Sequence, residues 1–67
     1  MLNKETVKNW LNKNGWLILG DTPTQIYRTC KTSVSAMSPL GVSVTFYFDE
    51  NDVCKYHGSN LGIAWAR

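Results

Sequence analysis

The stretch of residues 42–56, VSVTFYFDENDVCKY, constrains the fold more than any other part of the sequence. Its first half alternates apolar and polar side chains, and the apolar members are Val42, Val44, Phe46 and Phe48. Because successive side chains of a strand point to opposite faces, these four groups share one side of a sheet. Residues 49–52 are turn formers. The stretch therefore predicts a β-hairpin with one apolar face that the rest of the chain must cover.

The length of the hairpin loop decides which side chains meet across the two strands. A loop of three residues pairs Phe48 with Cys54 and Phe46 with Tyr56, whereas a loop of two residues places Lys55 opposite Phe46. A slip of one residue moves every side chain of a strand to the other face of the sheet. We therefore predict the three-residue loop, since it keeps apolar side chains beside one another.

Residues 1–15 have the capping residues and the apolar spacing of an amphipathic helix. Asn3 is a good N-cap residue, and Gly15 suits the left-handed position that follows a C-cap at Asn14. Trp16 can then contact the last turn, as in a Schellman ending. The apolar positions recur at helical spacing and predict a buried stripe of Val7, Trp10 and Leu11.

Apolar runs and breakers divide the remaining chain into short elements. Further strands are predicted at residues 16–19, at residues 25–31 with an extension to residue 34, and at residues 61–67. Turns are predicted at residues 20–23 and 57–60, and a loose loop is predicted at residues 33–41. Three tryptophans, Trp10, Trp16 and Trp65, are all expected in the core.

The elements together predict an α+β fold in a single small domain, residues 1–67. Consecutive strands most often neighbour each other, so the strands should form an antiparallel β-meander of four to five short strands. The N-terminal helix should pack on one face of this sheet and give two layers.

A single helix covers only one face of such a sheet, so the other face should carry a mixture of rings, hydroxyls and cations. Tyrosines combine a large rigid body with a polar tip and are efficient contact residues. A solvated sheet face has a similar composition, so that interpretation stays open. If the face binds a partner, the expected contact residues are Tyr27, Lys31, Tyr47, Lys55 and His57.

The sequence shows no convergent set of catalytic, cofactor or metal ligands. Cys54 and His57 have the spacing C-x-x-H, but residues three apart on a strand point to opposite faces. Adding Cys30 gives three candidate ligands, and a closed zinc site needs four. The acidic residues of the hairpin loop lack calcium-loop spacing, and no glycine-rich phosphate loop occurs. We therefore expect no enzyme activity, no metal and no cofactor.

The two cysteines and the absence of an apolar signal or membrane-spanning stretch favour a cytoplasmic protein with reduced thiols. A bond between Cys30 and Cys54 would require their strands to lie side by side. The formal net charge is +2, and the basic residues form no run, so nucleic acid is not a required partner.

These features predict a small non-enzymatic interaction module. It would act as an inhibitor or accessory factor that docks on a larger protein through the free sheet face and the 33–41 loop, a role that suits small phage or mobile-element proteins. The alternative is binding of nucleic acid or a nucleotide through the same tyrosines and lysines. An unpaired edge strand could also pair with a second copy of the chain.

Overall fold

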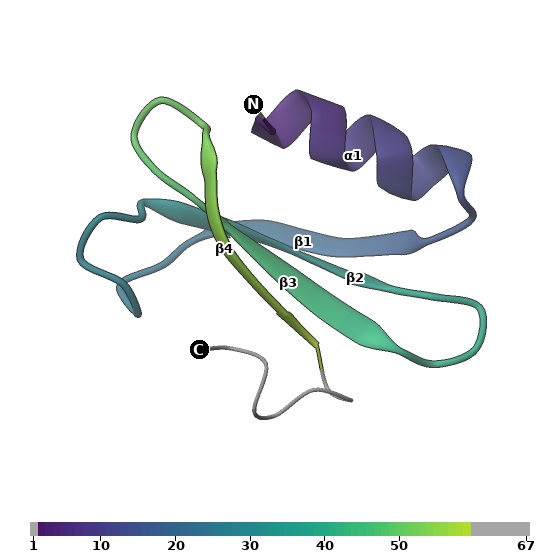
Figure 1. Cartoon of the computed structure of the whole chain (residues 1–67). Helices are drawn as coiled ribbons and strands as arrows, with labels where there is room; N and C mark the ends of the chain where they lie inside the picture. Colours follow the sequence, from purple (N-terminus) through teal and green to yellow (C-terminus); the bar gives the residue numbers. More distant parts are fainter. Residues whose placement is uncertain (1, 60–67) are drawn as a thin grey trace.

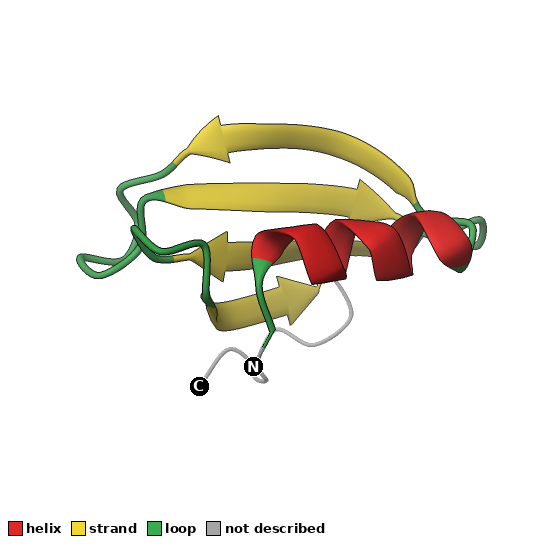
Figure 2. Cartoon of the chain, turned by 90° about the horizontal axis from the view of Figure 1, so that it is seen from above, coloured by secondary structure: helices red, strands yellow, loops and turns green. Residues whose placement is uncertain are grey.

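A helix lies over one face of a four-stranded antiparallel sheet in the computed structural model, which describes residues 2–59 (Figure 1). The elements are α1 (Lys4–Lys13), β1 (Leu17–Pro23), β2 (Thr32–Met37), β3 (Ser43–Phe48) and β4 (Cys54–Ser59). The strand order β1-β2-β3-β4 pairs each strand with its neighbours in the sequence, and Figure 2 shows the strands side by side beneath the helix. The predicted two-layer α+β fold is confirmed. The strand predicted at residues 61–67, with Trp65, lies outside the described residues.

The helix begins and ends where its capping residues predict. The Asn3 side chain accepts a hydrogen bond of 2.8 Å from the Thr6 backbone N–H. Gly15 adopts a φ of +79°, which a residue with a Cβ rarely adopts. The Trp16 backbone N–H then donates to the Leu11 carbonyl at 2.9 Å, the contact that defines a Schellman motif.

The chain just before α1 is held by the β3–β4 hairpin. Asn3 and Val53 form an isolated antiparallel bridge, and the Cys54 backbone N–H donates to the Leu2 carbonyl at 2.8 Å. The Lys4 backbone N–H, in the first turn of α1, also donates to the Asp52 carbonyl at 2.8 Å and is thereby satisfied. These bonds fix the start of α1 relative to the sheet.

The core lies between α1 and the central strands of the sheet. Leu11, Val34 and Phe48 are fully buried, and Val7 and Ala36 complete the cluster. Burial of large apolar side chains is the main favourable term in folding. The predicted strand phase of β3 is confirmed, because its phenylalanines face the helix side.

The predicted buried stripe is wrong at Trp10, because this residue is 53% exposed. A helix turns by about 100° per residue, so Val7 and Leu11 lie about 40° apart while Trp10 lies about 60° from Val7 on the far side. The sheet covers the arc between Val7 and Leu11 and leaves Trp10 at its margin. The Trp10 ring lies against Trp16, with ring centroids 6.3 Å apart.

The turn predicted at residues 20–23 is wrong, because β1 continues through Pro23. A β-bulge between Ile18 and Gly20 interrupts the pairing with β2, which then resumes. Proline is tolerated here because β1 is an edge strand and Pro23 is its last residue.

The strand predicted at residues 25–31 is also wrong, and most of the predicted 33–41 loop is in fact β2. Val34 and Ala36 are buried, while Ser33 and Ser35, which alternate with them, face the other way. Their small side chains make the alternation weak in the sequence, yet the core beneath α1 has room for them. Only residues 38–42 remain as the connection to β3.

The hairpin between β3 and β4 has the predicted three-residue loop. The Asp49 backbone N–H donates to the Val53 carbonyl at 3.0 Å, and Phe48 pairs with Cys54 as expected. The turn predicted at residues 57–60 is wrong, since β4 continues as far as Ser59.

A β-bulge changes the pairing beyond the first residue pair of this hairpin. The extra residue is Lys55, so Tyr47 pairs with Tyr56 and Phe46 pairs with His57. The predicted pairing of Phe46 with Tyr56 is therefore wrong. Because a bulge shifts the register by one residue, it moves Tyr56 to the face opposite α1 and His57 to the helix side.

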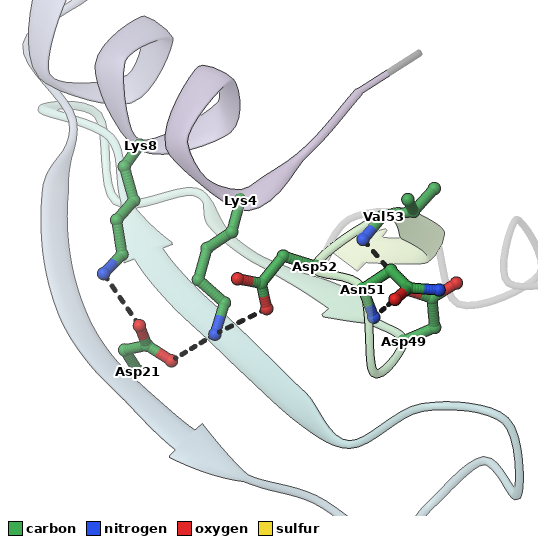
Figure 3. Close-up of polar contacts among 7 residues, drawn as sticks. All are labelled: Lys4, Lys8, Asp21, Asp49, Asn51, Asp52 and Val53. Carbon is green, nitrogen blue, oxygen red and sulfur yellow. Dashed lines mark hydrogen bonds and ion pairs between the residues drawn. The ribbon is translucent and has the colours of Figure 1, made fainter.

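Ion pairs tie α1 to β1 and to the β3–β4 hairpin (Figure 3). The Asp21 carboxylate contacts Lys8 at 2.7 Å and Lys4 at 3.2 Å, and Lys4 also lies 3.6 Å from Asp52. The hydrogen bond from Lys8 lowers the pKa of Asp21 most, burial opposes it, and Lys4 lowers it further. The charged form of Asp21 is therefore favoured by folding.

The Asp49 side chain stabilises the hairpin loop by accepting hydrogen bonds from backbone N–H groups of the loop. One Asp49 carboxylate oxygen accepts hydrogen bonds from the backbone N–H groups of Asn51, at 2.8 Å, and Val53, at 3.0 Å (Figure 3). The bond from Val53 is the largest cause of the lowered pKa of Asp49. This Asx turn explains why the loop takes three residues.

The ion pairs of Asp21 predict an acid-dependent loss of stability. Its folded pKa lies below the ordinary value of 3.8, so the pairs stabilise the fold above that pH and are lost as the pH falls through the folded pKa. Asp21→Asn should lower the free energy of unfolding by roughly 1 kcal/mol or less near neutral pH, and by almost nothing near pH 2. Denaturant titrations at both pH values measure this. Asp52→Asn, at a more exposed carboxylate, should have the smaller effect, and an Asp21→Asn deficit that is equal at both pH values would contradict the prediction.

The hydroxyl of Thr32 is buried and has no hydrogen-bond partner among residues 2–59. Thr32→Val keeps the shape and removes this unsatisfied group, so it should raise the free energy of unfolding by about 1 kcal/mol. The matched variant Thr45→Val breaks the 3.1 Å contact between the hydroxyls of Ser35 and Thr45 and should lower that free energy by about 0.5–1 kcal/mol. Thermal and denaturant unfolding of both variants measures the two changes in free energy of unfolding. If both free energies change in the same direction, the Thr32 hydroxyl is not a destabilising, unsatisfied group.

Candidate interaction surface

The face of the sheet opposite α1, called the open face below, carries hydroxyl, aromatic and a few apolar side chains of the strands. No helix within residues 2–59 lies on it (Figures 1 and 2). The registers place on it Ser33, Ser35, Ser43, Thr45, Tyr47 and Tyr56, together with Leu17, Thr22 and Met37 toward the β1 edge. The hydroxyls of Ser35 and Thr45 bond to each other across β2 and β3. We call the short hydroxyl side chains at the centre of this face the hydroxyl floor.

Three tyrosines gather at one end of the open face and form what we call the tyrosine cluster. Tyr47 and Tyr56 are paired across β3 and β4, and Tyr27 comes from the connection between β1 and β2. The Tyr27 ring stacks on Tyr56 at a centroid distance of 4.3 Å and an angle of 23°, and it meets Tyr47 nearly edge-on at 4.9 Å and 82°. Such stacked and edge-to-face pairs add about 0.5–1.5 kcal/mol each beyond the area they bury. The cluster is therefore a rigid aromatic platform.

The phenol hydroxyls of the tyrosine cluster are available to donate hydrogen bonds to a ligand. Among residues 2–59, no hydrogen bond involves any of these hydroxyls. Burial, followed by the proximity of Tyr27 and Cys30, raises the pKa of Tyr47, so its hydroxyl stays protonated. Tyr56 is the most accessible ring, with 43% of its surface exposed.

The connection of residues 24–31, called the 24–31 segment below, presents Tyr27 from a bonded loop. The Thr24 backbone N–H donates to the Lys31 carbonyl at 3.0 Å and closes the segment. The Lys31 backbone N–H donates to the Phe48 carbonyl at 2.8 Å and fastens the segment to β3. Cys30, next to this anchor, is buried. The segment thus has a fixed base even though it contains no strand.

A polar hollow of about 350 Å³ lies within the 24–31 segment. Its lining includes Tyr27, Arg28 and Lys31, so the hollow adjoins the tyrosine cluster and its two charged side chains are both cationic. Neither cation forms a salt bridge within the described part of the chain. Both side chains are exposed.

The structure brings together only some of the residues predicted to bind a partner. Tyr27 and Tyr47 are in contact, and Lys31 lies in the same segment as Tyr27. Lys55 is the bulge residue, and its amine lies 3.9 Å from the Asp49 carboxylate. His57 lies on the helix side, with its ring centroid 6.2 Å from that of Phe46, so it does not join the open face.

Tyr56 and Arg28 belong to this surface and were not among the predicted contact residues. Tyr56 was placed on the apolar side by the simple register, and only the bulge at Lys55 turns it over. In a strand over residues 25–31, Arg28 would share a face with Ile26 and Cys30, and a cation among apolar side chains is a signal in the sequence that the 24–31 segment is not a strand.

A second surface is an apolar groove of about 280 Å³ on the helix side. It is lined by Leu2, Thr6, Val7, Trp10 and Phe46, where α1 leaves part of β3 uncovered. Leu2 and Trp10 expose about half of their surface here, 55% and 53%. The groove therefore contains aromatic and aliphatic contacts but no charged group.

Cys30 and Cys54 are both free thiols. Burial, followed by the proximity of Cys30, raises the pKa of Cys54, which disfavours its reactive thiolate. Residues 2–59 contain no group of three or more His, Cys, Asp or Glu side chains that could hold a metal ion. In the same part of the chain, no helix has the length and apolar character needed to cross a bilayer.

No protein-family model, curated protein or solved structure matches this chain. Its function is therefore inferred from the geometry and chemistry of the open face. That face carries the tyrosine cluster and the hydroxyl floor, and the hollow that adjoins the cluster is lined by two cations.

The tyrosine cluster should stabilise the 24–31 segment. Tyr27→Ala removes both ring contacts, so amide hydrogen exchange at Thr24 and Cys30, whose N–H groups bond within the segment, should accelerate at least tenfold. Ile26→Ala is the matched control, because Ile26 lies in the same segment and its side chain is 69% exposed. Equal exchange in the two variants would show that the rings do not hold the segment.

Proposed function

We propose that this chain is a small non-enzymatic interaction module that docks on a larger protein through its open face. In this proposal it acts as an inhibitor or accessory factor, and the tyrosine cluster is the centre of the contact. The observation that carries the proposal is the mutual packing of Tyr27, Tyr47 and Tyr56 on the face opposite the helix.

Pre-ordered tyrosines suit protein recognition for an energetic reason. Association costs conformational entropy, and side chains that are already fixed lose less of it on binding. Tyr27 is held by both other rings, while Tyr56 keeps an accessible part for a partner. Tyrosine is also enriched at the centres of protein interfaces, where its ring and hydroxyl both contribute.

The corrected fold changes the extent of the proposed contact surface. Residues 33–37 belong to β2 and contribute Ser33 and Ser35 to the sheet face instead of forming a loop. The 24–31 segment takes the place that the 33–41 loop had in the sequence-based hypothesis, because it carries Tyr27 and the hollow. The proposed surface is therefore the tyrosine cluster, the adjoining hollow and the hydroxyl floor.

Binding of nucleic acid or a nucleotide is the second candidate, and the two cations beside the aromatic rings favour it. Bases stack on ring faces, and in the tyrosine cluster Tyr27 and Tyr56 already stack on each other. A phosphate backbone also needs a row of cations, whereas Arg28 and Lys31 lie together at one end of the face. These features rank protein binding first.

The test is capture of partners from the source cells with the tagged chain and two aromatic variants. Tyr56→Ala removes an exposed ring from the open face, and the control Trp10→Ala removes a similarly exposed ring from the helix side. Circular dichroism and thermal melts establish that both variants are folded. We expect a stoichiometric protein to be retained by the wild type and by Trp10→Ala, and to bind Tyr56→Ala at least tenfold more weakly, about 1.4 kcal/mol.

The opposite pattern, with loss of capture in Trp10→Ala alone, would contradict the proposal and assign the contact to the apolar groove. Nuclease treatment before capture separates the second candidate. Retention of a protein partner after that treatment supports the protein-binding proposal, whereas captured nucleic acid and steep loss of binding with salt support the alternative.

A further inference from the structure

We infer that the partner meets the open face with carboxylate side chains, so that the ligand of this surface is an acidic protein segment. Arg28 and Lys31 would pair with its carboxylates, and the hydroxyls of the tyrosine cluster would donate hydrogen bonds to them. The inference rests on the proposed function and adds the chemistry of the partner.

The first support is the distribution of charge along the chain. Residues 22–48 contain two charged side chains, Arg28 and Lys31, and no aspartate or glutamate. Both cations line the hollow in the 24–31 segment, and neither has an ion pair among residues 2–59. This end of the surface is therefore positive and has no acidic side chain from its own segment to neutralise it.

The acidic residues are largely engaged elsewhere in the fold. Asp21 pairs with Lys4 and Lys8 on the helix side, and Asp52 also pairs with Lys4 (Figure 3). The Asp49 carboxylate accepts two backbone bonds in the hairpin loop. The ion pairs of Lys4 and Lys8 thus join α1 to Asp21 and Asp52, and Lys55 pairs with Asp49, whereas Arg28 and Lys31 line the hollow beside the tyrosine cluster without an ion pair among residues 2–59.

The second support is hydrogen-bonding capacity. The three phenol hydroxyls make no hydrogen bond within residues 2–59, and the raised pKa of Tyr47 keeps its hydroxyl a donor. An ionised carboxylate only accepts hydrogen bonds, and charge-assisted bonds from hydroxyls and guanidinium groups are the strong ones. A planar guanidinium such as that of Arg28 can also bind a carboxylate in a bidentate manner.

The third support separates a carboxylate from the phosphates of a nucleic acid. Stacking of Tyr27 on Tyr56 occupies one face of each ring and so leaves fewer ring faces for bases, whereas none of the three hydroxyls is engaged within residues 2–59. Two neighbouring cations match one or two carboxylates, while a phosphate backbone engages many cations along its length. The geometry points to a compact acidic segment of a protein.

The experiment titrates the full chain with three probes and follows its backbone amide resonances. The probes are an eight-residue peptide that alternates glutamate and glycine, the same peptide with glutamine for glutamate, and an eight-nucleotide thymidine strand. We expect the acidic peptide to shift the resonances of the 24–31 segment and of Tyr47 and Tyr56 in a saturable manner. The glutamine peptide should shift them at least tenfold more weakly.

Charge and hydroxyl variants locate the contact. The double variant Arg28→Gln, Lys31→Gln should weaken binding of the acidic peptide at least tenfold, whereas Lys13→Gln, in the last turn of α1, should leave it within twofold. Tyr56→Phe removes one hydroxyl and keeps the ring, and it should weaken the acidic peptide about threefold or more.

Three results would overturn the inference: equal binding of the glutamine peptide, equal weakening by Lys13→Gln, or tighter binding of the thymidine strand at the same resonances. Failure here is distinct from failure of the proposed function. If Tyr56→Ala abolishes capture of the protein partner but the double variant captures it fully, the open face binds a protein and the acidic chemistry is wrong.

Discussion

The packing of Phe48 and Val34 against Leu11 is the contact on which the rest of the structure depends. It holds the helix to one face of the sheet, and the chain has no second helix within residues 2–59 to cover the other. A strand sends neighbouring side chains to opposite faces, so the same β3 that supplies Phe48 to the core must present Tyr47 on the other side. The alternation of side chains along β3 therefore determines both the core and the candidate binding surface.

Backbone bonds and ion pairs at the ends of the elements complete this one-sided core. The N-terminal residues pair with the β3–β4 hairpin, and Asp21 joins β1 to the helix through two lysines. Surface ion pairs of this kind contribute little energy individually, but they fix where the helix lies. Their location also has a chemical consequence, because it holds the Asp21 carboxylate on the helix side of the sheet, opposite the open face.

The bulge at Lys55 shows how one residue can redistribute chemistry between two faces. Without it, Tyr56 would join the core side and His57 would lie opposite Thr45 on the open face. With it, Tyr56 stacks on Tyr27, and the histidine lies near Phe46 instead. Bulges next to functional surfaces often serve to redirect a side chain in this way.

The sequence by itself determined the features that depend on residues close together in the chain. The cap at Asn3, the left-handed Gly15 and the three-residue hairpin loop each involve contacts within a few residues, as does the alternation in β3, so local preferences were sufficient. Those features also gave the two-layer α+β fold. They gave two of the three tyrosines of the candidate surface, because Tyr27 and Tyr47 were predicted on that side.

Only the tertiary structure decided what depends on the space left by other elements. Val34 and Ala36 become a strand because the core beneath α1 accepts small side chains, and the sheet edge tolerates Pro23. The bulge at Lys55 depends on how β4 pairs with β3 beyond the hairpin loop, so no local sequence pattern predicted it. The contact of Tyr27 with Tyr56 joins residues far apart in the sequence, and such contacts are fixed by packing rather than by propensity.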